Sequence, residues 1–279
     1  MPELPEVETI ARGVDARVRG DRIVEAWFSG HREPFKTPPG RQAKGLEGRT
    51  ILEVHRTGKH LVCELGPAHG SLSSEKQGKS GAQWIVHLGM SGRLQICLPH
   101  EDVAKHTHAI VRLESGRELR FVDPRRFGRL SVAVAGGFDA GGMEPLDADL
   151  DSFVALFRGR KTPIKSALLN QKLLRGVGNI YADESLFRAG IRPRRRASTI
   201  TRDRLAKLHV SVKEVLREAI ALGGSSISDY VDADGEEGFF QLQHRVYGRE
   251  GELCLVCKTP IKRIVIAGRS SHYCQTCQK

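Results

Sequence analysis

Apolar residues at the beginning of the chain follow the period of an α-helix. Within residues 5–20 they recur every three or four positions, at Val7, Ile10, Ala11, Val14 and Val18. Pro5 suits the first turn of a helix, where no backbone donor is needed, and Gly20 suits its C-terminal end. The pattern therefore predicts one amphipathic helix at the N-terminus.

The helical period then gives way to short β-rich runs. Seven β-rich runs, separated by glycine, proline and charged turns, occupy residues 22–28, 50–65, 82–88, 92–98, 108–114, 117–122 and 129–135. Because the 50–65 run is long enough to form two strands, these runs amount to seven or eight. Short strands without intervening helices indicate an antiparallel sandwich rather than a doubly wound sheet.

The second half of the chain has a different pattern. Residues 136–151 contain four glycines and four aspartates and are typical of a linker, and residues 69–81 are typical of a polar loop between strands. Helical patterns follow near 151–157, 163–174, 179–188 and 201–222, before short strands return around cysteines. We expect an α+β multidomain protein, with a helix and sandwich in 1–135, a linker in 136–151, a helical domain in 152–240 and a cysteine module in 241–279.

Composition narrows the class of protein. The sequence is 39% hydrophobic and 28% charged, and it has no apolar run of the length that spans a bilayer. Its acidic opening, MPELPEVET, lacks the basic and apolar regions of a secretory signal. For a bacterial protein this favours a cytoplasmic location.

The net charge of +11 is unevenly distributed. Residues 1–150 hold 21 Lys and Arg against 20 Asp and Glu, whereas residues 151–279 hold 23 against 13. Such an excess either covers a solvated surface or meets a polyanion such as nucleic acid. Charge alone does not separate DNA from RNA or anionic lipid.

Four cysteines near the C-terminus have the spacing of a metal site. They form C-x2-C-x16-C-x2-C, at Cys254, Cys257, Cys274 and Cys277. Two such pairs complete a tetrahedral four-sulfur site with no open position, which predicts one structural Zn²⁺. Two disulfides are the alternative, but they require an oxidising compartment that nothing in the sequence supports. Cys63 and Cys97 stand alone in strand patterns and are expected to be small apolar residues.

Five motifs in order carry a resemblance that runs nearly end to end. They are PELPEVE after Met1, HLGMSG (87–92), DPRRFG (123–128), QKLLRGVGNIYADE (171–184) and the terminal cysteine ribbon. Together they resemble bacterial formamidopyrimidine-DNA glycosylases. The resemblance implies a sandwich with a helix–two-turn–helix domain and a zinc finger. It also implies excision of oxidised purines from double-stranded DNA, followed by β,δ-elimination at the abasic site.

The N-terminal residues suit this chemistry. Removal of Met1 makes Pro2 a secondary α-amine, whose ordinary pKa near 8 leaves part of it neutral and nucleophilic. Attack at the sugar C1′ then gives a cationic iminium that draws electrons for elimination. Proline after methionine is also a common translation start. Glu3 is placed to transfer protons, and the resemblance assigns it that role. Glu6 would hold the amine or the damaged nucleotide in place. Alternatively, it is simply an acidic residue of the kind that the first turn of a helix favours.

A base inside a duplex is reached only when its nucleotide is flipped out. Met90, Arg125 and Phe127 match the residues that fill the resulting void in the family. Taken singly, Met90 would more often belong to a core and Phe127 to the end of a strand, so this prediction depends on the paired motifs.

Further basic and amide residues match family positions that contact the DNA backbone. The resemblance implies that Lys59 and Arg269 contact the lesion phosphate and take part in elimination. It places His106, Arg160, Lys165 and Asn179 at other backbone contacts. Lys161 is an alternative to Arg160, and a solvated surface charge is the alternative for each isolated basic residue.

Two other functions remain open from the sequence. The sister family of endonuclease VIII-like enzymes excises oxidised pyrimidines and usually has Gly where this chain has Leu4. A zinc protein that binds lesions without cutting is the other possibility, against which the Pro2–Glu3 pair argues. Residues 223–238 are either an ordinary linker or a segment that contacts the lesion. We expect a monomer that binds DNA and no membrane.

Overall fold

The computed structural model describes residues 1–31, 34–68, 81–226, 233, 236 and 238–279. Two compact units share this chain. The N-terminal unit comprises residues 1–140 and 225–238, and the C-terminal unit comprises 141–224 and 239–279. Sequence reasoning placed 225–238 with the helices, whereas the fold returns this segment to the N-terminal unit.

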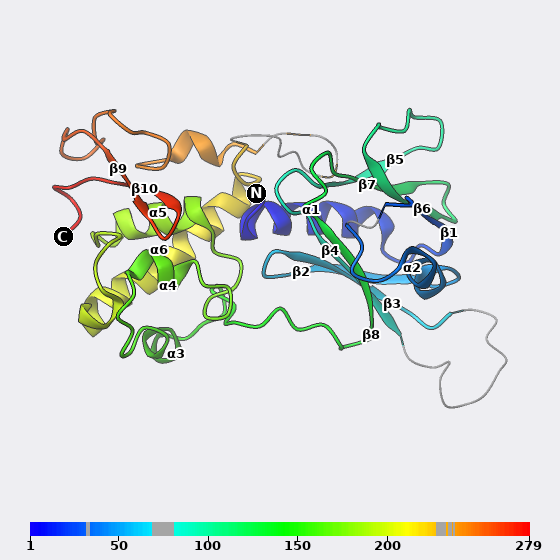
Figure 1. Ribbon diagram of the computed structural model, residues 1–279, viewed down its shortest axis with the longest axis horizontal. Coiled ribbons are helices and arrows are strands. Elements are labelled where there is room, and N and C mark those ends of the chain that lie inside the picture. Colours follow the sequence, from blue (N-terminus) through cyan, green and yellow to red (C-terminus); the bar gives the residue numbers. More distant parts are fainter. Residues whose placement is uncertain (32–33, 69–80, 227–232, 234–235, 237) are drawn as a thin grey trace. The chain divides into compact units, whose positions relative to one another are not determined.

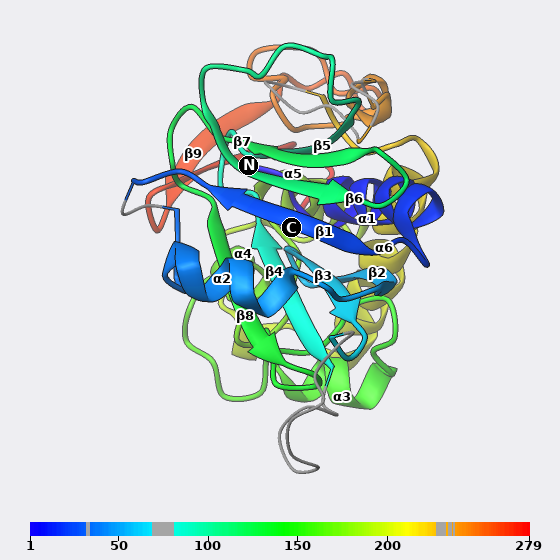
Figure 2. The same ribbon diagram turned by 90° about the vertical axis from the view of Figure 1, so that its right-hand side faces the viewer.

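The N-terminal unit contains two four-stranded antiparallel sheets, which Figure 2 shows one above the other. One sheet has the order β1-β6-β7-β5, from Ile23–Phe28, Thr107–Leu113, Glu118–Val122 and Arg93–Cys97. The other has the order β2-β3-β4-β8, from Ile51–Thr57, His60–Leu65, Ala82–His87 and Arg129–Val134. The antiparallel sandwich predicted from the short β-rich runs is therefore confirmed.

Helix α1 (Leu4–Val18) packs on the sandwich with the face that the sequence indicated. Val7, Ile10, Ala11, Val14 and Val18 are all buried in one core with residues from both sheets. Gly20 follows the helix with a φ of 84°, a conformation that side chains with a Cβ seldom adopt. Burial of the apolar stripe thus fixes the N-terminus of the helix against the sandwich.

A second helix of this unit, α2 (Pro39–Leu46), was not predicted. It has two glycines within eight residues and buries only Gln42 and Leu46, so its apolar pattern is too short to recognise. Pro38 and Pro39 suit the helix start, because their missing backbone donors would have no partner there.

The C-terminal unit holds four α-helices, α3 (Leu150–Ala155), α4 (Ile164–Leu168), α5 (Asn179–Arg188) and α6 (Arg202–Ala221), among its described residues (Figure 1). α4 is shorter than the pattern over 163–174 suggested. The side chain of Gln171 binds the carbonyls of Leu169 and Val177 and the N–H of Gly176. Such bonds compete with helix formation, so the chain turns tightly before α5.

The unit ends with a short 3-10 turn (Phe240–Gln243) and a hairpin of β9 (Lys262–Ile266) and β10 (Arg269–Tyr273). Ala267 and Gly268, both with positive φ, form the two-residue turn of this hairpin. No helix among the described residues is long and apolar enough to cross a bilayer.

Candidate active site and zinc module

The N-terminal amine lies in a charged and partly buried environment. The α-amine that Met1 carries interacts with Glu3, Glu6, Lys59 and Arg125, and burial lowers its pKa below the ordinary value. The two carboxylates oppose that shift and the two cations reinforce it. A lower pKa leaves more of an amine neutral, and therefore nucleophilic, near pH 7.

The two glutamates beside this amine are held by α1. Glu3 is the N-cap of the helix, and its backbone N–H donates to Glu6 Oε2 at 2.8 Å in a capping box. The other oxygen of Glu6 accepts from the backbone N–H of Ser225 at 2.8 Å. Glu6 therefore joins the N-terminal helix to the start of the 225–238 segment, a contact across 219 positions of the sequence.

Lys59 follows the tight turn at Gly58, between β2 and β3, and its side chain is largely buried. The next residue, His60, contacts the ring of His87 at a centroid distance of 4.8 Å. Burial, together with His60 and the Lys59 ammonium, lowers the pKa of His87 to about 4. His87 is consequently neutral near pH 7, and its Nδ1 accepts from the N–H of Gly89.

One buried carboxylate ties the two loops that carry HLGMSG and DPRRFG. Asp123 is fully buried, and its oxygens accept from the hydroxyl of Ser91 at 2.6 Å and from the backbone N–H groups of Arg125 and Gly128. A Cβ on Gly89 would lie 2.5 Å from the backbone of residues 127 and 128, so only glycine allows this approach.

The same two loops expose the side chains predicted to fill a DNA void. Met90 is 44% exposed and Phe127 is 49% exposed, although both are large and apolar. The Arg125 guanidinium lies 4.8 Å from the centre of the Phe127 ring, a cation–π distance. Apolar side chains held in water on rigid turns suit insertion into a base stack.

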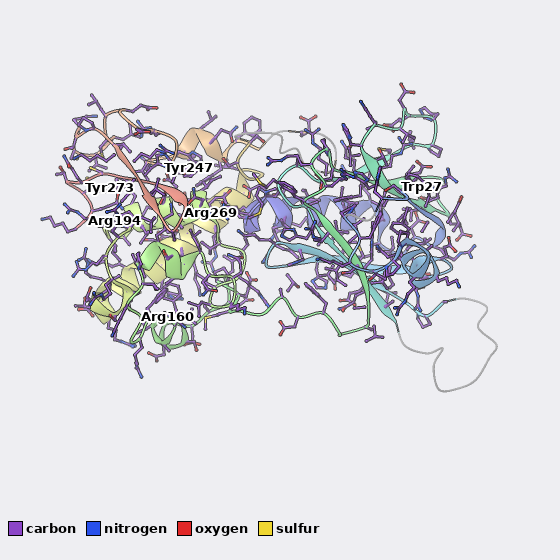
Figure 3. The ribbon with its side chains drawn as sticks, viewed as in Figure 1. Trp27, Arg160, Arg194, Tyr247, Arg269 and Tyr273 are labelled. Atoms are coloured by element: carbon purple, nitrogen blue, oxygen red, sulfur yellow. The ribbon has the colours of Figure 1, made fainter. Side chains whose placement is uncertain are left out.

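His106 is exposed at the rim of a pocket of about 450 Å³ in the N-terminal unit. Its lining is aromatic and basic and includes Trp27 (labelled in Figure 3), His31, Lys105 and Arg126. This chemistry suits an anion such as a phosphate.

In the C-terminal unit, Asn179 contacts the strand that begins with Arg269. Asn179 opens α5 directly after Gly178, and its side-chain amide lies 3.3 Å from the hydroxyl of Ser270 on β10. Arg269, the residue before Ser270, is exposed at the start of the same strand (Figure 3). An amide, a guanidinium and a helix N-terminus together can hold a phosphate.

Lys165 is not placed as the sequence suggested. Its side chain is 0% exposed, its Nζ lies 2.7 Å from Asp183 Oδ1, and it donates to the carbonyl of Ser270 at 2.6 Å. A phosphate contact by Lys165 is therefore wrong, because the ammonium is buried behind the surface. Arg160, labelled in Figure 3, is partly buried and its Nε donates to the carbonyl of Leu156, while Lys161 beside it is exposed.

The cysteine module has the geometry of a zinc site. The Sγ atoms of Cys254, Cys257, Cys274 and Cys277 all lie within 4.8 Å of one another. Two Sγ distances are 3.9 Å and 3.3 Å, near the ~3.8 Å edge expected of a tetrahedron with Zn–S bonds of about 2.3 Å. All four cysteines are free thiols, so the disulfide alternative fails.

The sequence analysis missed three buried carboxylates that hold the segments carrying the candidate site residues. Asp123 and Asp183 lie inside quoted motifs, yet nothing in the pattern marked them as anchors. Glu184 is another, because its carboxylate accepts from the backbone N–H groups of residues 245–247 at the entry to the cysteine module. For Glu184 the available signal was its helical spacing from apolar residues, three positions from both Tyr181 and Phe187.

Family models match three successive parts of the chain. They describe a formamidopyrimidine-DNA glycosylase N-terminal domain over residues 1–130, the H2TH domain of that enzyme over 142–231, and a zinc finger found in FPG and IleRS over 251–279. The chain is also 46% identical to a formamidopyrimidine-DNA glycosylase of Solibacter usitatus over 281 residues, covering all of both chains. The chain belongs to the formamidopyrimidine-DNA glycosylase family.

Solved structures of the family agree with the fold. The MutM (Fpg) protein of Thermus thermophilus superposes with a TM-score of 0.85 at 39% identity, covering 99% of this chain and 98% of that one. An Fpg variant of Lactococcus lactis, in complex with Fapy-dG-containing DNA, gives a TM-score of 0.89 at 33% identity over the whole of both chains. The membership accounts for the zinc finger, whose four cysteines form a site for one zinc ion.

Two sequence-based predictions for this family fold lie largely outside the described residues. The polar loop at 69–81 is described only at Gly81, and most of 227–237, in the segment predicted to contact the lesion, lies outside the described residues. Within that segment, Ala233 packs in the N-terminal core and its carbonyl accepts from the N–H of Ile96.

Proposed function

We propose that this chain is a bifunctional DNA glycosylase and abasic-site lyase that acts in base excision repair. Its substrates are oxidised purines in duplex DNA, 8-oxoguanine and formamidopyrimidines, and its nucleophile is the amine of Pro2 after removal of Met1. The observation that supports the proposal is the environment of the N-terminus, where the Met1 amine interacts with two carboxylates and two cations, because removal of Met1 leaves Pro2 as the terminal amine beside Glu3 and Glu6.

The first step joins Pro2 to the sugar. The amine lone pair forms a bond to C1′, and the base leaves with the electrons of the glycosidic bond and gains a proton. The nitrogen then loses its own proton and expels the ring oxygen O4′, which takes a proton from Glu3. The product is an iminium between Pro2 and an opened sugar, with Glu6 holding the amine and helix start in place.

Strand cleavage follows by two eliminations. Loss of a proton from C2′ breaks the C3′–O bond, and the phosphate of the downstream strand leaves with the electron pair. Loss of a proton from C4′ then breaks the C5′–O bond and releases the upstream strand. Lys59 supports the first departing phosphate and Arg269 the second, because each cation stabilises charge that develops on a phosphate oxygen.

The remaining sites bind and open the duplex. Met90, Arg125 and Phe127 are proposed to occupy the space left by the flipped nucleotide. His106, Asn179 and either Arg160 or Lys161 are proposed to contact backbone phosphates. Lys165 is not included among these contacts. The zinc ion, bound by the four cysteine thiolates, supplies structure and no chemistry, since a four-sulfur site has no position for substrate.

Each domain has its own part in the proposed function. We propose residues 1–135, together with the 225–238 segment, as the catalytic domain, the remainder of 152–240 as the helical DNA-binding domain and 241–279 as the zinc module, joined by the linker 136–151. The enzyme is expected to work as a monomer in the cytoplasm, associated with the nucleoid. Lactococcus lactis Fpg has also been solved in complex with DNA that contains an abasic site and with DNA that contains an oxidised pyrimidine. Pyrimidine lesions are therefore the alternative substrate.

Borohydride trapping tests the nucleophile. The reagent reduces an iminium irreversibly, so enzyme and 8-oxoguanine duplex should become covalently joined only in its presence. Peptide mapping should place the adduct on Pro2. Pro2→Gly should retain some trapping through a primary amine, and protein that retains Met1 should bind the duplex without trapping or cleaving it.

Two outcomes would overturn the assignment. An adduct on Lys59, or trapping with Met1 retained, means that another amine is the nucleophile. Glu3→Gln should bind lesions and cleave poorly, whereas the matched change Glu214→Gln, at an exposed position of α6, should leave the rate unaltered. Binding without cleavage by the unmodified enzyme would favour the non-catalytic alternative.

A further inference from the structure

A buried ion pair in the C-terminal unit contacts the strand that carries Arg269. Lys165 of α4 and Asp183 of α5 are both 0% exposed, and Lys165 Nζ lies 2.7 Å from Asp183 Oδ1. Transfer of two charges out of water is unfavourable, and apolar residues of similar volume usually give equal or greater stability. Stability alone therefore does not explain why charges occupy these positions.

Both members of the pair also hold the backbone of β10. Lys165 Nζ donates to the carbonyl of Ser270 at 2.6 Å, and Asp183 Oδ2 accepts from the N–H of His272 at 2.8 Å. Hydrogen bonds to charged groups are shorter and stronger than neutral ones. The strand is thus fixed at two alternate residues, the first of which directly follows Arg269.

Ser270 is the point where these contacts meet the proposed phosphate site. Its carbonyl accepts from Lys165, while its hydroxyl lies 3.3 Å from the side-chain amide of Asn179. Asn179 and Asp183 are four residues apart on α5, so they lie on the same face of that helix. A displacement of Ser270 would therefore move Arg269 relative to Asn179.

We propose that Lys165 and Asp183 are positioning residues for the second elimination. They fix β10 so that Arg269 lies against the phosphate that leaves when the C5′–O bond breaks. The inference rests on the proposed function, and specifically on the part that Arg269 has in this step. In that step a proton leaves C4′, the electrons shift along the conjugated sugar fragment, and the phosphate of the upstream strand takes the pair from the C5′–O bond.

The product ratio on abasic-site DNA measures this step separately from folding. With a 5′-labelled strand, the first elimination alone leaves an unsaturated sugar on the labelled fragment, whereas both eliminations leave a 3′-phosphate. Because both products come from the same active molecules, their ratio does not depend on how much enzyme is folded. Arg269→Ala provides the reference for loss of the second step.

The decisive variant is Lys165→Met combined with Asp183→Asn. It removes both charges, keeps the volume, and retains a side-chain oxygen for the N–H of His272, so an unpaired buried charge is avoided. We expect it to hold one zinc per chain and excise 8-oxoguanine at nearly the normal rate. Its ratio of 3′-phosphate to unsaturated product should fall about tenfold, since a small misplacement of a catalytic group costs this much or more.

Two further variants serve as a control and as a test of the Ser270 hydroxyl. Lys207→Met makes the same chemical change at an exposed position of α6 and should leave the ratio unaltered. Ser270→Ala keeps the carbonyl that Lys165 binds and removes only the hydroxyl beside Asn179. Because Ser270 is only partly buried, this variant should fold, and we expect its ratio to fall by about threefold.

The outcomes separate this inference from the function on which it rests. If the unmodified enzyme cleaves abasic DNA by both eliminations, and the folded double variant keeps the normal ratio, the positioning role is wrong. If the double variant does not fold, Asp183→Asn alone takes its place, since it keeps an oxygen for the N–H of His272 and removes the charge that faces Lys165, and a normal ratio in it overturns the inference instead. A normal ratio in Arg269→Ala overturns it together with the role of Arg269, while absence of any cleavage by the unmodified enzyme refutes the proposed function.

Discussion

Each of the two units uses one fully buried aspartate to hold a segment that exposes side chains to solvent, but the partners of the two aspartates differ. Asp123 in the N-terminal unit accepts hydrogen bonds from a hydroxyl and two backbone N–H groups, all within its own loop or the adjacent HLGMSG loop. Asp183 in the C-terminal unit faces a buried ammonium, from Lys165, and holds the backbone of a distant strand.

The difference concerns what happens when one partner is lost. When one of several neutral donors is removed, the free energy of unfolding falls only modestly, because the other donors still bind the carboxylate. Removal of Lys165 leaves a negative charge in a dry environment without its counter-ion. The N-terminal anchor is therefore expected to tolerate substitution better than the C-terminal one.

The two tryptophans allow the two units to be followed separately. Trp27 and Trp84 both belong to the N-terminal unit, so tryptophan fluorescence reports the unfolding of that unit. Zinc release to a coloured chelator reports the C-terminal unit, which holds all four ligand cysteines.

Loss of zinc should have the largest effect. Cys257→Ser removes one thiolate from the four-sulfur site, and a structural zinc site contributes on the order of 10 kcal/mol to the fold that it closes. The variant should lose the metal and bind DNA weakly, while the fluorescence transition of the N-terminal unit stays unaltered. Elemental analysis and urea titration check this. Absence of zinc from the native, undialysed protein would refute the metal assignment.

The buried charges should have the next largest effect, and they test the comparison directly. Lys165→Met should destabilise the C-terminal unit by about 3–5 kcal/mol, measured as zinc release at lower urea concentration. Ser91→Ala, which removes one neutral donor to Asp123, should destabilise the N-terminal unit by about 1–3 kcal/mol. Equal losses for the two variants would show that the type of partner does not matter.

The exposed side chains that Asp123 holds should affect activity rather than stability. Phe127→Ala and Met90→Ala should slow excision of 8-oxoguanine from duplex about tenfold or more, and slow cleavage of a preformed abasic site much less. Single-turnover rates on the two substrates give the comparison. Equal slowing on both would mean that these residues only support the loops.

The smallest effect is expected from the loss of stability at low pH through two buried histidines. Burial lowers the pKa of His87 in one unit, and of His244 in the other, to about 4. Between a pH of about 6.5 and about 4 the unfolded chain binds protons that the folded chain does not, so stability falls as the pH falls through this window. Each histidine should lower the stability of its own unit by about 1 kcal/mol near pH 5.5.

Glutamine replacements separate this effect from the titration of carboxylates. His87→Gln should flatten the pH dependence of the fluorescence transition alone, and His244→Gln that of zinc release alone. A pH dependence that neither change alters would assign the acid sensitivity to other groups.

Local patterns in the sequence determined most elements of this protein, with helix α2 as an exception, and one complete site. Short β-rich runs between turn residues gave the strands of the sandwich, and the apolar stripe from Val7 to Val18 gave the first helix, because the helical period corresponds to one buried face. The four cysteines were sufficient to predict zinc, since their spacing alone brings the thiolates close together. The five motifs identified the family in the same way, as contiguous strings of residues.

Only the tertiary structure decided what surrounds those residues. Lys165 was expected at a phosphate because a lysine is usually exposed, but its counter-ion Asp183 lies 18 positions away and its carbonyl partner 105 positions away. The bond from Ser225 to Glu6 likewise spans 219 positions and returns residues 225–238 to the N-terminal unit. No local period records such contacts. They exist because a buried charge or backbone donor must find its partner in the folded core, wherever the chain brings one.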